Sequence, residues 1–409
     1  MSITATRYRR GLRDVSQAAC MQARIPDSLR FVLVAAILAV AVPSRADDVT
    51  ESPSAPAPSK FKDPEDGRFD ISARLDSAQG FLPILVPITE PAVGYGAVLG
   101  AVFIYGNKAD KGGQFVRPNI AAVGGVRTEN GTEGWFGAHL GTWLDDHLRT
   151  LVALADVDVN LEFFGLGGDR VEGAGLGYSI KARGGVAGGT YRIGDSQVWM
   201  GMRFLSMRTT VGFDSASQPL SSVPAADSNL RLGAVTPSIT FDRRDNFFTP
   251  TSGWYVDLSV PIYRQSLGSD RDFETLNLTA LYYRPLGRAL YLGVRATGQD
   301  STSETPFFLR PFVSLRGVQA LRYQGERVAE IEAEIRWQLY PRFSVLGFAG
   351  AGSARSSSAT DRVESVTAGG AGFRYLIARR YGLHLGLDVA GSPDDRAIYV
   401  VFGNAWLRP

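Results

Sequence analysis

The chain has 409 residues, of which 44% are hydrophobic and 21% are charged, and its formal net charge is +2. This composition excludes a disordered protein, and the balanced charge argues against a partner made of nucleic acid. Only three His and one Cys are present, which are too few to indicate a zinc, haem or iron–sulfur site. We therefore expect no metal and no cofactor.

Residues 1–46 have the layout of a signal peptide. Twelve apolar residues, 31–42, follow two arginines and precede a Pro-Ser-Arg-Ala sequence with small residues at the −3 and −1 positions. The apolar stretch is too short to span a membrane as a helix, which favours a signal peptide. The alternative interpretation is an uncleaved anchor. Met21 is a second candidate start, and starting there would remove Cys20. We predict an exported protein whose signal peptide is cleaved.

Residues 47–79 are polar and rich in Pro, Ser and Ala. Such a composition predicts a flexible periplasmic tether. The segment is shorter than the about 40 residues that a domain usually needs to fold alone. We therefore expect no separate periplasmic domain here.

Residues 80–409 show a different pattern, in which apolar and polar residues alternate with the period of a β-strand. The clearest runs are 253–263, 327–340 and 381–390. They are longer than the five or six residues usual in soluble strands, and they suit a tilted crossing of a bilayer. A soluble sandwich would also alternate, but it does not require such long strands.

Sixteen strands are predicted, and an even number places both ends of a barrel on one side of the membrane. Short turns on one side alternate with long loops at 161–177, 214–230 and 301–326 on the other, which are expected to be external. The fold class is therefore all-β, a single sixteen-stranded antiparallel transmembrane β-barrel. The strands are expected near 81–88, 93–105, 117–127, 133–144, 147–160, 178–192, 196–213, 231–242, 253–263, 272–285, 288–300, 327–340, 342–352, 363–377, 381–390 and 396–406.

The last predicted strand ends in aromatic residues, with Ile398, Val400, Phe402 and Trp406 expected on one face. A final strand of this kind resembles the signal that the outer-membrane assembly machinery reads. The expected partners are therefore the outer-membrane lipid bilayer and the barrel assembly machinery, the latter for the insertion of the chain itself.

Three motifs follow one another in the second half of the chain, at the positions of a turn, a long loop and the strand after that loop. They are Asp242, Arg243, Asp245, Pro250 and Gly253 in the turn, Leu315, Arg316 and Gly317 in the loop, and Glu332 to Arg336 in the strand.

In this order the motifs resemble the barrel domain of the bacterial surface antigen family, the superfamily of outer-membrane protein-assembly and two-partner-secretion factors (BAM/TAM type). The resemblance covers about 230–406 by motif and 81–230 by layout. We expect a member of that family without its periplasmic polypeptide-binding (POTRA) repeats. The resemblance implies that the long loop folds back into the lumen, where its Arg316 pairs with a carboxylate on the barrel wall.

The candidate partners of Arg316 in the lumen are Glu332, Glu334 and Asp388, because Gly350 stands where many family members have Asp. A guanidinium–carboxylate pair in a confined lumen is stronger than a pair on the surface. One alternative is that Arg316 is a solvated residue of an external loop. The glutamates of this strand could instead select cations in a pore, or be neutralised by neighbouring arginines.

The turn motif is predicted to be structural, with Asp side chains bonding turn amides and with Pro250 and Gly253 setting the backbone dihedrals. A contact with a periplasmic partner is the alternative. We predict no catalytic residues and no enzyme: the chain has no G-x-S-x-G sequence, and its glycine-rich runs do not fit a phosphate-binding loop.

If the chain works as its relatives do, it assists the insertion or translocation of unfolded polypeptides or lipids at the outer membrane of a Gram-negative bacterium. We expect a weak seam between the first and last strands, because Pro83 and Pro87 cannot donate ladder hydrogen bonds. A passive, porin-like channel and a structural surface protein are the alternative functions.

Overall fold

The computed structural model of the chain describes residues 61–73, 80–90, 92–105, 119–163, 176–213, 229–356 and 362–406. The predicted signal peptide and the first part of the predicted tether lie outside these ranges. Within them, no helix is long and apolar enough to cross a membrane.

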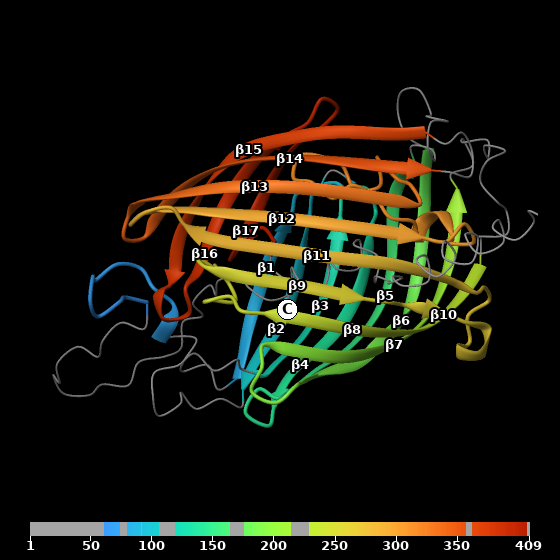
Figure 1. The fold of residues 1–409 in the computed structure, drawn as a ribbon, viewed down its shortest axis with the longest axis horizontal. Helices are drawn as coiled ribbons and strands as arrows, with labels where there is room; N and C mark the ends of the chain where they lie inside the picture. Colours follow the sequence, from blue (N-terminus) through green and yellow to red (C-terminus); the bar gives the residue numbers. More distant parts are fainter. Residues whose placement is uncertain are drawn as a thin grey trace, which may run out of the picture.

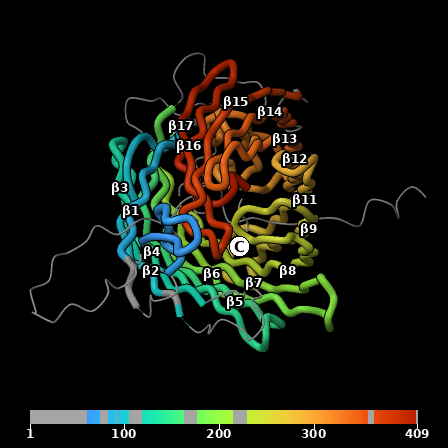
Figure 2. The backbone as a smooth tube through the Cα atoms, turned by 90° about the vertical axis from the view of Figure 1, so that its left-hand side faces the viewer, coloured from blue at the N-terminus to red at the C-terminus, as the bar shows by residue number. Residues whose placement is uncertain are grey.

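All the strands of the described residues belong to one antiparallel sheet, in which each pairs with the next to form a barrel (Figure 1; Figure 2 shows the end where residues 61–73 lie). The strands are β1 (Gly80–Ile88), β2 (Gly96–Tyr105), β3 (Asn119–Thr128), β4 (Glu133–Trp143), β5 (Leu148–Phe163), β6 (Leu176–Arg192), β7 (Val198–Phe213), β8 (Asn229–Asp242), β9 (Gly253–Ser259), β10 (Ile262–Tyr263), β11 (Phe273–Pro285), β12 (Leu290–Ser301), β13 (Arg327–Tyr340), β14 (Phe343–Ser356), β15 (Arg362–Ala378), β16 (Leu383–Gly391) and β17 (Arg396–Phe402). Three short 3-10 helices are η2 (Gln265–Leu267), η3 (Phe307–Leu309) and η4 (Arg379–Tyr381).

Strands β9 and β10 are two parts of one continuous strand. Ser259 pairs with Ser238 of β8 and Ile262 pairs with Val235, so the register does not change between them. The interruption falls at Pro261, which has no N–H to donate. The predicted all-β antiparallel barrel is thus confirmed, and counting β9 and β10 together gives sixteen strands in the described residues.

The end of the last strand differs from the prediction. Strand β17 stops at Phe402, and Gly403 adopts a φ of 74°, a left-handed conformation that turns the chain. Trp406 then lies buried, 5% exposed, whereas Ile398 is 50% exposed on the outside. The expectation that Trp406 shares a strand face with Ile398 was wrong, because the strand pattern does not reveal a turn made by a single glycine.

The outer face of the barrel is a belt of exposed large apolar side chains. On β4, Trp135 is 51% exposed while its neighbour Phe136, on the inner face, is fully buried. Exposed apolar residues on this scale indicate contact with lipid rather than water. Others on the outer face include Leu85, Leu99, Val152, Leu154, Phe204, Ile331 and Ile335.

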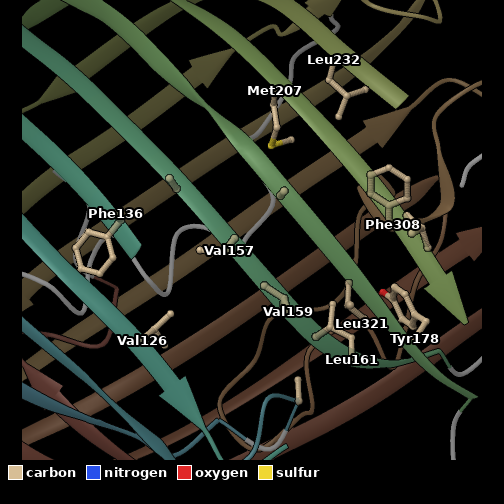
Figure 3. Close-up of a cluster of buried hydrophobic side chains, with 14 of the residues drawn as sticks. Val126, Phe136, Val157, Val159, Leu161, Tyr178, Met207, Leu232, Phe308 and Leu321 are labelled. Atoms are coloured by element: carbon tan, nitrogen blue, oxygen red, sulfur yellow. The ribbon is translucent and has the colours of Figure 1, made fainter. Parts of the chain in front are cut away.

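The interior has two chemically different halves. The inner faces of β3 to β8 carry apolar side chains such as Phe136, Val157 and Tyr178, and Figure 3 shows them packed with Phe308 and Leu321 of the loop between β12 and β13. The inner faces of β12, β13, β15 and β16 carry buried arginines and carboxylates instead. Buried apolar packing on one side is unlike the polar, water-filled interior of a porin.

Candidate functional site: an ion-pair cluster inside the barrel

The long loop between β12 and β13 folds into the barrel as a hairpin. The backbone N–H of Val313 donates to the carbonyl of Tyr323 at 3.0 Å, and that of Gly325 donates to the carbonyl of Pro311 at 3.0 Å. Val313 and Tyr323 pack in a buried cluster with Val328 of β13 and with side chains of β14 and β15. The loop is therefore held against the barrel wall on its charged side by apolar burial as well as by hydrogen bonds.

Arg316 lies at the centre of a group of carboxylates from the wall. Its Nε donates to Glu332 at 2.6 Å, and its Nη1 lies 2.9 Å from Glu334 and 2.8 Å from Asp388. Its guanidinium carbon is 3.5 Å from the centroid of the Phe348 ring. The structure thus brings the loop arginine together with all three carboxylates that the sequence nominated, and it does not leave Arg316 solvated.

The residues on either side of Arg316 explain how the backbone comes so close to the wall. Leu315 is buried beside Gly350, where a Cβ would lie 2.9 Å from the Leu315 Cδ2 atom. Gly317 has a φ of 88°, and a Cβ there would lie 2.6 Å from the backbone nitrogen of Gly391. Its N–H donates to the hydroxyl of Tyr399 on β17 at 3.0 Å. Any side chain at Gly317 would push the loop off the wall.

Two further arginines of the wall pair with its carboxylates. Arg295 lies 3.3 Å from Glu330 and 3.2 Å from Glu332, and Arg374 donates to Asp388 at 2.9 Å. Arginine partners for these carboxylates favour mutual neutralisation over the selection of cations in a pore.

Glu332 also receives a hydrogen bond from the end of the chain. The indole Nε1 of Trp406 donates to Glu332 at 2.9 Å, and its ring packs against Tyr283 of β11. One carboxylate therefore joins the loop, through Arg316, to the segment that follows the last strand. The sequence did not predict this link, because Trp406 was expected in the last strand, on the same face as Ile398.

The turn motif between β8 and β9 is held by its own side chains. Asp242 accepts from Arg244 at 2.8 Å, and Asp245 accepts from the backbone N–H of Thr251 at 2.9 Å. Arg243 donates its backbone N–H to Trp254 at 2.8 Å. Pro250 is buried, and Gly253 has a φ of 107° with no room for a Cβ, which would lie 2.0 Å from the Arg243 carbonyl oxygen. These contacts favour a structural role.

The same turn also contacts residues near β16 and β17, at the same end of the barrel. Asn246 donates to the carbonyl of Tyr381 at 3.1 Å, and Thr249 lies 3.1 Å from the Nδ1 of His384. Asn404, beyond β17, donates to the carbonyl of Phe248 at 3.1 Å. The turn therefore joins β8 and β9 to β16 and to the end of the chain.

At the opposite end of the barrel, the tip of the long loop contacts residues on both sides of the junction between β17 and β1. Arg322 lies 2.9 Å from Asp395 of the β16–β17 turn. The backbone N–H of Ala320 donates at 3.4 Å to Glu90, which follows β1. Burial raises the pKa of the Glu90 carboxyl to about 7, and the nearby Asp395 adds to this shift.

We expect the packing of Glu90 against the loop to become less stable as the pH rises, because burying the ionised carboxylate costs more than the Ala320 N–H bond returns. A folded-state pKa of about 7, against an ordinary 4.5, means that the folded state binds the proton more tightly, so this stabilisation is complete below pH 4.5 and is lost as the pH passes 7. Amide hydrogen exchange at Ala320, corrected for its intrinsic pH dependence, should therefore accelerate between pH 5 and 8. Glu90→Gln should remove the dependence, and an identical pH profile in both proteins would contradict the assignment.

The described residues contain no group of three or more His, Cys, Asp or Glu side chains arranged to hold a metal ion. The chemistry of the site is that of charge pairing, which fixes a loop to a wall. The fold and this loop together define an outer-membrane-type β-barrel whose interior is occupied by its own external loop.

Comparison with known proteins points to the same superfamily as the sequence motifs. Residues 175–375 match the Omp85 superfamily domain. Its members are outer-membrane proteins of Gram-negative bacteria that act as assembly or transport factors. No sequence among the curated proteins matches the chain.

Solved structures show the same fold. BamA from Haemophilus ducreyi lacking POTRA domains 1–3 superposes with a TM-score of 0.55 and 10% identity, over 84% of this chain and 80% of that one. CdiB from Acinetobacter baumannii gives a TM-score of 0.54 and 10% identity, over 79% of this chain and 59% of that one. CdiB from Escherichia coli gives 0.51 and 12%, over 78% and 58%.

Proposed function

We propose that this barrel assists the insertion or translocation of polypeptides or lipids at the outer membrane by opening between β1 and β17. One observation carries the proposal. Every other pair of neighbouring strands is joined by a ladder, whereas among the described residues no ladder joins β1 to β17. A junction that lacks backbone hydrogen bonds costs less to open than any other position around the barrel.

The prolines of β1 give a physical reason for the open junction. Strand β1 pairs with β2 along its whole length, with Pro83 opposite Ala101 and Pro87 opposite Ala97. A proline has no N–H, so the prolines fit this ladder only if their nitrogens point away from β2, towards β17. The edge of β1 that faces β17 therefore lacks two donors, and a full ladder there is disfavoured.

The loop inside the barrel supplies contacts that the backbone does not. It binds Asp388 of β16 through Arg316, Tyr399 of β17 through Gly317, and Glu90 after β1 through Ala320. These contacts can break and re-form without the loss of any backbone hydrogen bonds between neighbouring strands. We infer that the loop steadies the junction and that the ion-pair cluster sets how readily it opens.

Crosslinking tests the proposal. Cysteines at Leu85 and Val400, on the two strands of the junction, should form a disulfide that holds it closed. The oxidised protein in liposomes should then catalyse the insertion of a refolding outer-membrane barrel about tenfold more slowly, and reduction should restore the rate. Insertion is followed by the change in gel mobility of the folded client.

A matched control places cysteines at Val389 and Ile398, which face each other on the paired strands β16 and β17. Both side chains are exposed on the outer face, so this disulfide adds the same bond without closing the junction. Its insertion rate should equal that of the unmodified barrel. Equal rates for the oxidised junction pair and the control would rule out the opening mechanism.

A further inference from the structure

Residues 61–73 precede the barrel and fold against one of its ends, although the composition predicted only a flexible tether. The backbone N–H of Ile71 donates to the carbonyl of Ile377 on β15 at 2.8 Å. Tyr375 donates its hydroxyl to the carbonyl of Phe69 at 2.9 Å. Figure 1 shows this blue segment beside the ends of β13 to β16. We call residues 61–73 the docked segment.

One buried arginine of the barrel bonds to three carboxylates of the docked segment. Arg342, in the turn between β13 and β14, is buried and bonds to Asp63 and Asp66 at 2.5 Å and to Asp70 at 2.8 Å. Three carboxylates around one guanidinium fix the position of the whole turn 63–70. The remaining side chains of the turn are thereby held at the outer rim of the barrel.

The docked segment and the barrel line an open, shallow pocket of about 780 Å³ on the outer surface. Its walls are mostly apolar and come from both parts of the chain. Arg68 and Phe69 line it on the segment side, and Tyr340, Phe343, Val345 and Phe373 are among the residues that line it on the barrel side. These four barrel side chains belong to the exposed apolar belt, so the pocket is continuous with the surface that contacts lipid.

Arg68 gives the pocket a positive charge at its rim. The side chain is exposed, and within the described residues no carboxylate pairs with its guanidinium, because Asp63, Asp66 and Asp70 all bond to Arg342. Aromatic side chains with an arginine beside them are typical of the level of lipid headgroups in a membrane protein. A free guanidinium there matches the charge and the geometry of a phosphate.

We propose that this pocket binds one anionic phospholipid of the periplasmic leaflet. Its phosphate lies against Arg68, and its acyl chains lie along Phe343, Val345 and Phe373. The site is independent of the junction between β1 and β17. The docked segment therefore does more than connect the barrel to what precedes it, because it completes a lipid site that the barrel alone does not contain.

The test counts the lipid that stays with the intact protein. The barrel is reconstituted in an equal mixture of phosphatidylcholine and phosphatidylglycerol, extracted gently, and examined by native mass spectrometry. One phosphatidylglycerol should be retained in preference to phosphatidylcholine. Arg68→Gln should lower its retention about tenfold, as the loss of one charge-assisted bond predicts.

Arg288→Gln is the matched control, since Arg288 is also exposed, lies in the turn between β11 and β12 at the same end, and does not line the pocket. It should retain phosphatidylglycerol like the unmodified protein. Phe69→Ala should weaken retention of both lipids, because it removes an apolar wall. Heat-modifiable mobility verifies that each variant is folded.

Two results would overturn the proposal. Equal retention by the Arg68 and Arg288 variants would show that the pocket does not recognise the headgroup. Displacement of the lipid by millimolar inorganic phosphate would show a simple anion site rather than a phospholipid site, because phosphate cannot replace the apolar contacts of the acyl chains.

Discussion

Arg316→Ala is expected to turn a barrel of low or flickering conductance into one with large, steady conductance in a planar bilayer. Within the part of the chain that the structure describes, the guanidinium is the one group that contacts Glu332, Glu334 and Asp388 together. Removing one partner from a buried ion pair costs about 3–5 kcal/mol, because the remaining charges stay buried. This cost destabilises the state in which the loop lies inside the barrel. We therefore expect the loop to detach from the wall.

Arg327→Ala is the control for this experiment. Arg327 stands at the start of β13 and pairs with Asp300 at 3.0 Å, but its side chain is 67% exposed. An exposed pair contributes about 0–1 kcal/mol, so this variant should conduct like the unmodified barrel. Large, steady conductance in the unmodified protein as well would favour a passive channel and contradict the loop-filled interior.

Arg342→Met is expected to release the docked segment from the barrel. The arginine is only 1% exposed, and methionine replaces its stem but not its bonds to Asp63, Asp66 and Asp70. Three carboxylates would be left together with only the half-exposed Arg379 near one of them, at a cost of about 3–5 kcal/mol. Trypsin should then cut after Lys62 or Arg68 about 100-fold faster or more, as a local opening equilibrium of this size predicts.

The matched control is Arg379→Gln. Arg379 binds Glu65 at 2.7 Å, but its side chain is 46% exposed, and its loss should change the cleavage rate severalfold at most. The contact of Arg379 with Asp63 is longer, at 3.7 Å. If both variants were cut at the same rate, Arg342 would not be the residue that holds the segment.

The fold could be predicted from the sequence because alternation is a local signal that repeats in every strand. Residues 327–340 show it most clearly, and strand β13 has those same bounds. The strand that contains Pro261 could still be predicted, because the alternation continues on both sides of the proline. The ends of strands were less predictable, since a tight turn such as that at Gly403 leaves no periodic trace.

The site was predictable only in part. The wall carboxylates could be nominated because alternation shows which residues of a strand share a face, and the charged face of β13 suits the lumen rather than lipid. Other contacts join residues that are far apart in sequence. They are the bond from Trp406 to Glu332 and the bonds from Arg342 to the docked segment, and no local sequence pattern predicts them. The apolar inner faces of β3 to β8 were also unexpected, because alternation alone does not show which face of a strand is the inner one.

The order in which the barrel is completed follows from the partners of the loop. Arg316 and Asp388 are 72 residues apart, and Glu332 and Trp406 are 74 apart. These contacts can form only after β16, β17 and the turn at Gly403 have reached the membrane, and contacts so distant in sequence form late in folding. A chain that stalls before its last two strands would therefore keep a loop whose Arg316 lacks Asp388, one of its three carboxylate partners. A complete ion-pair cluster around Arg316 would then distinguish fully assembled molecules from incomplete ones, which can still be refolded or degraded.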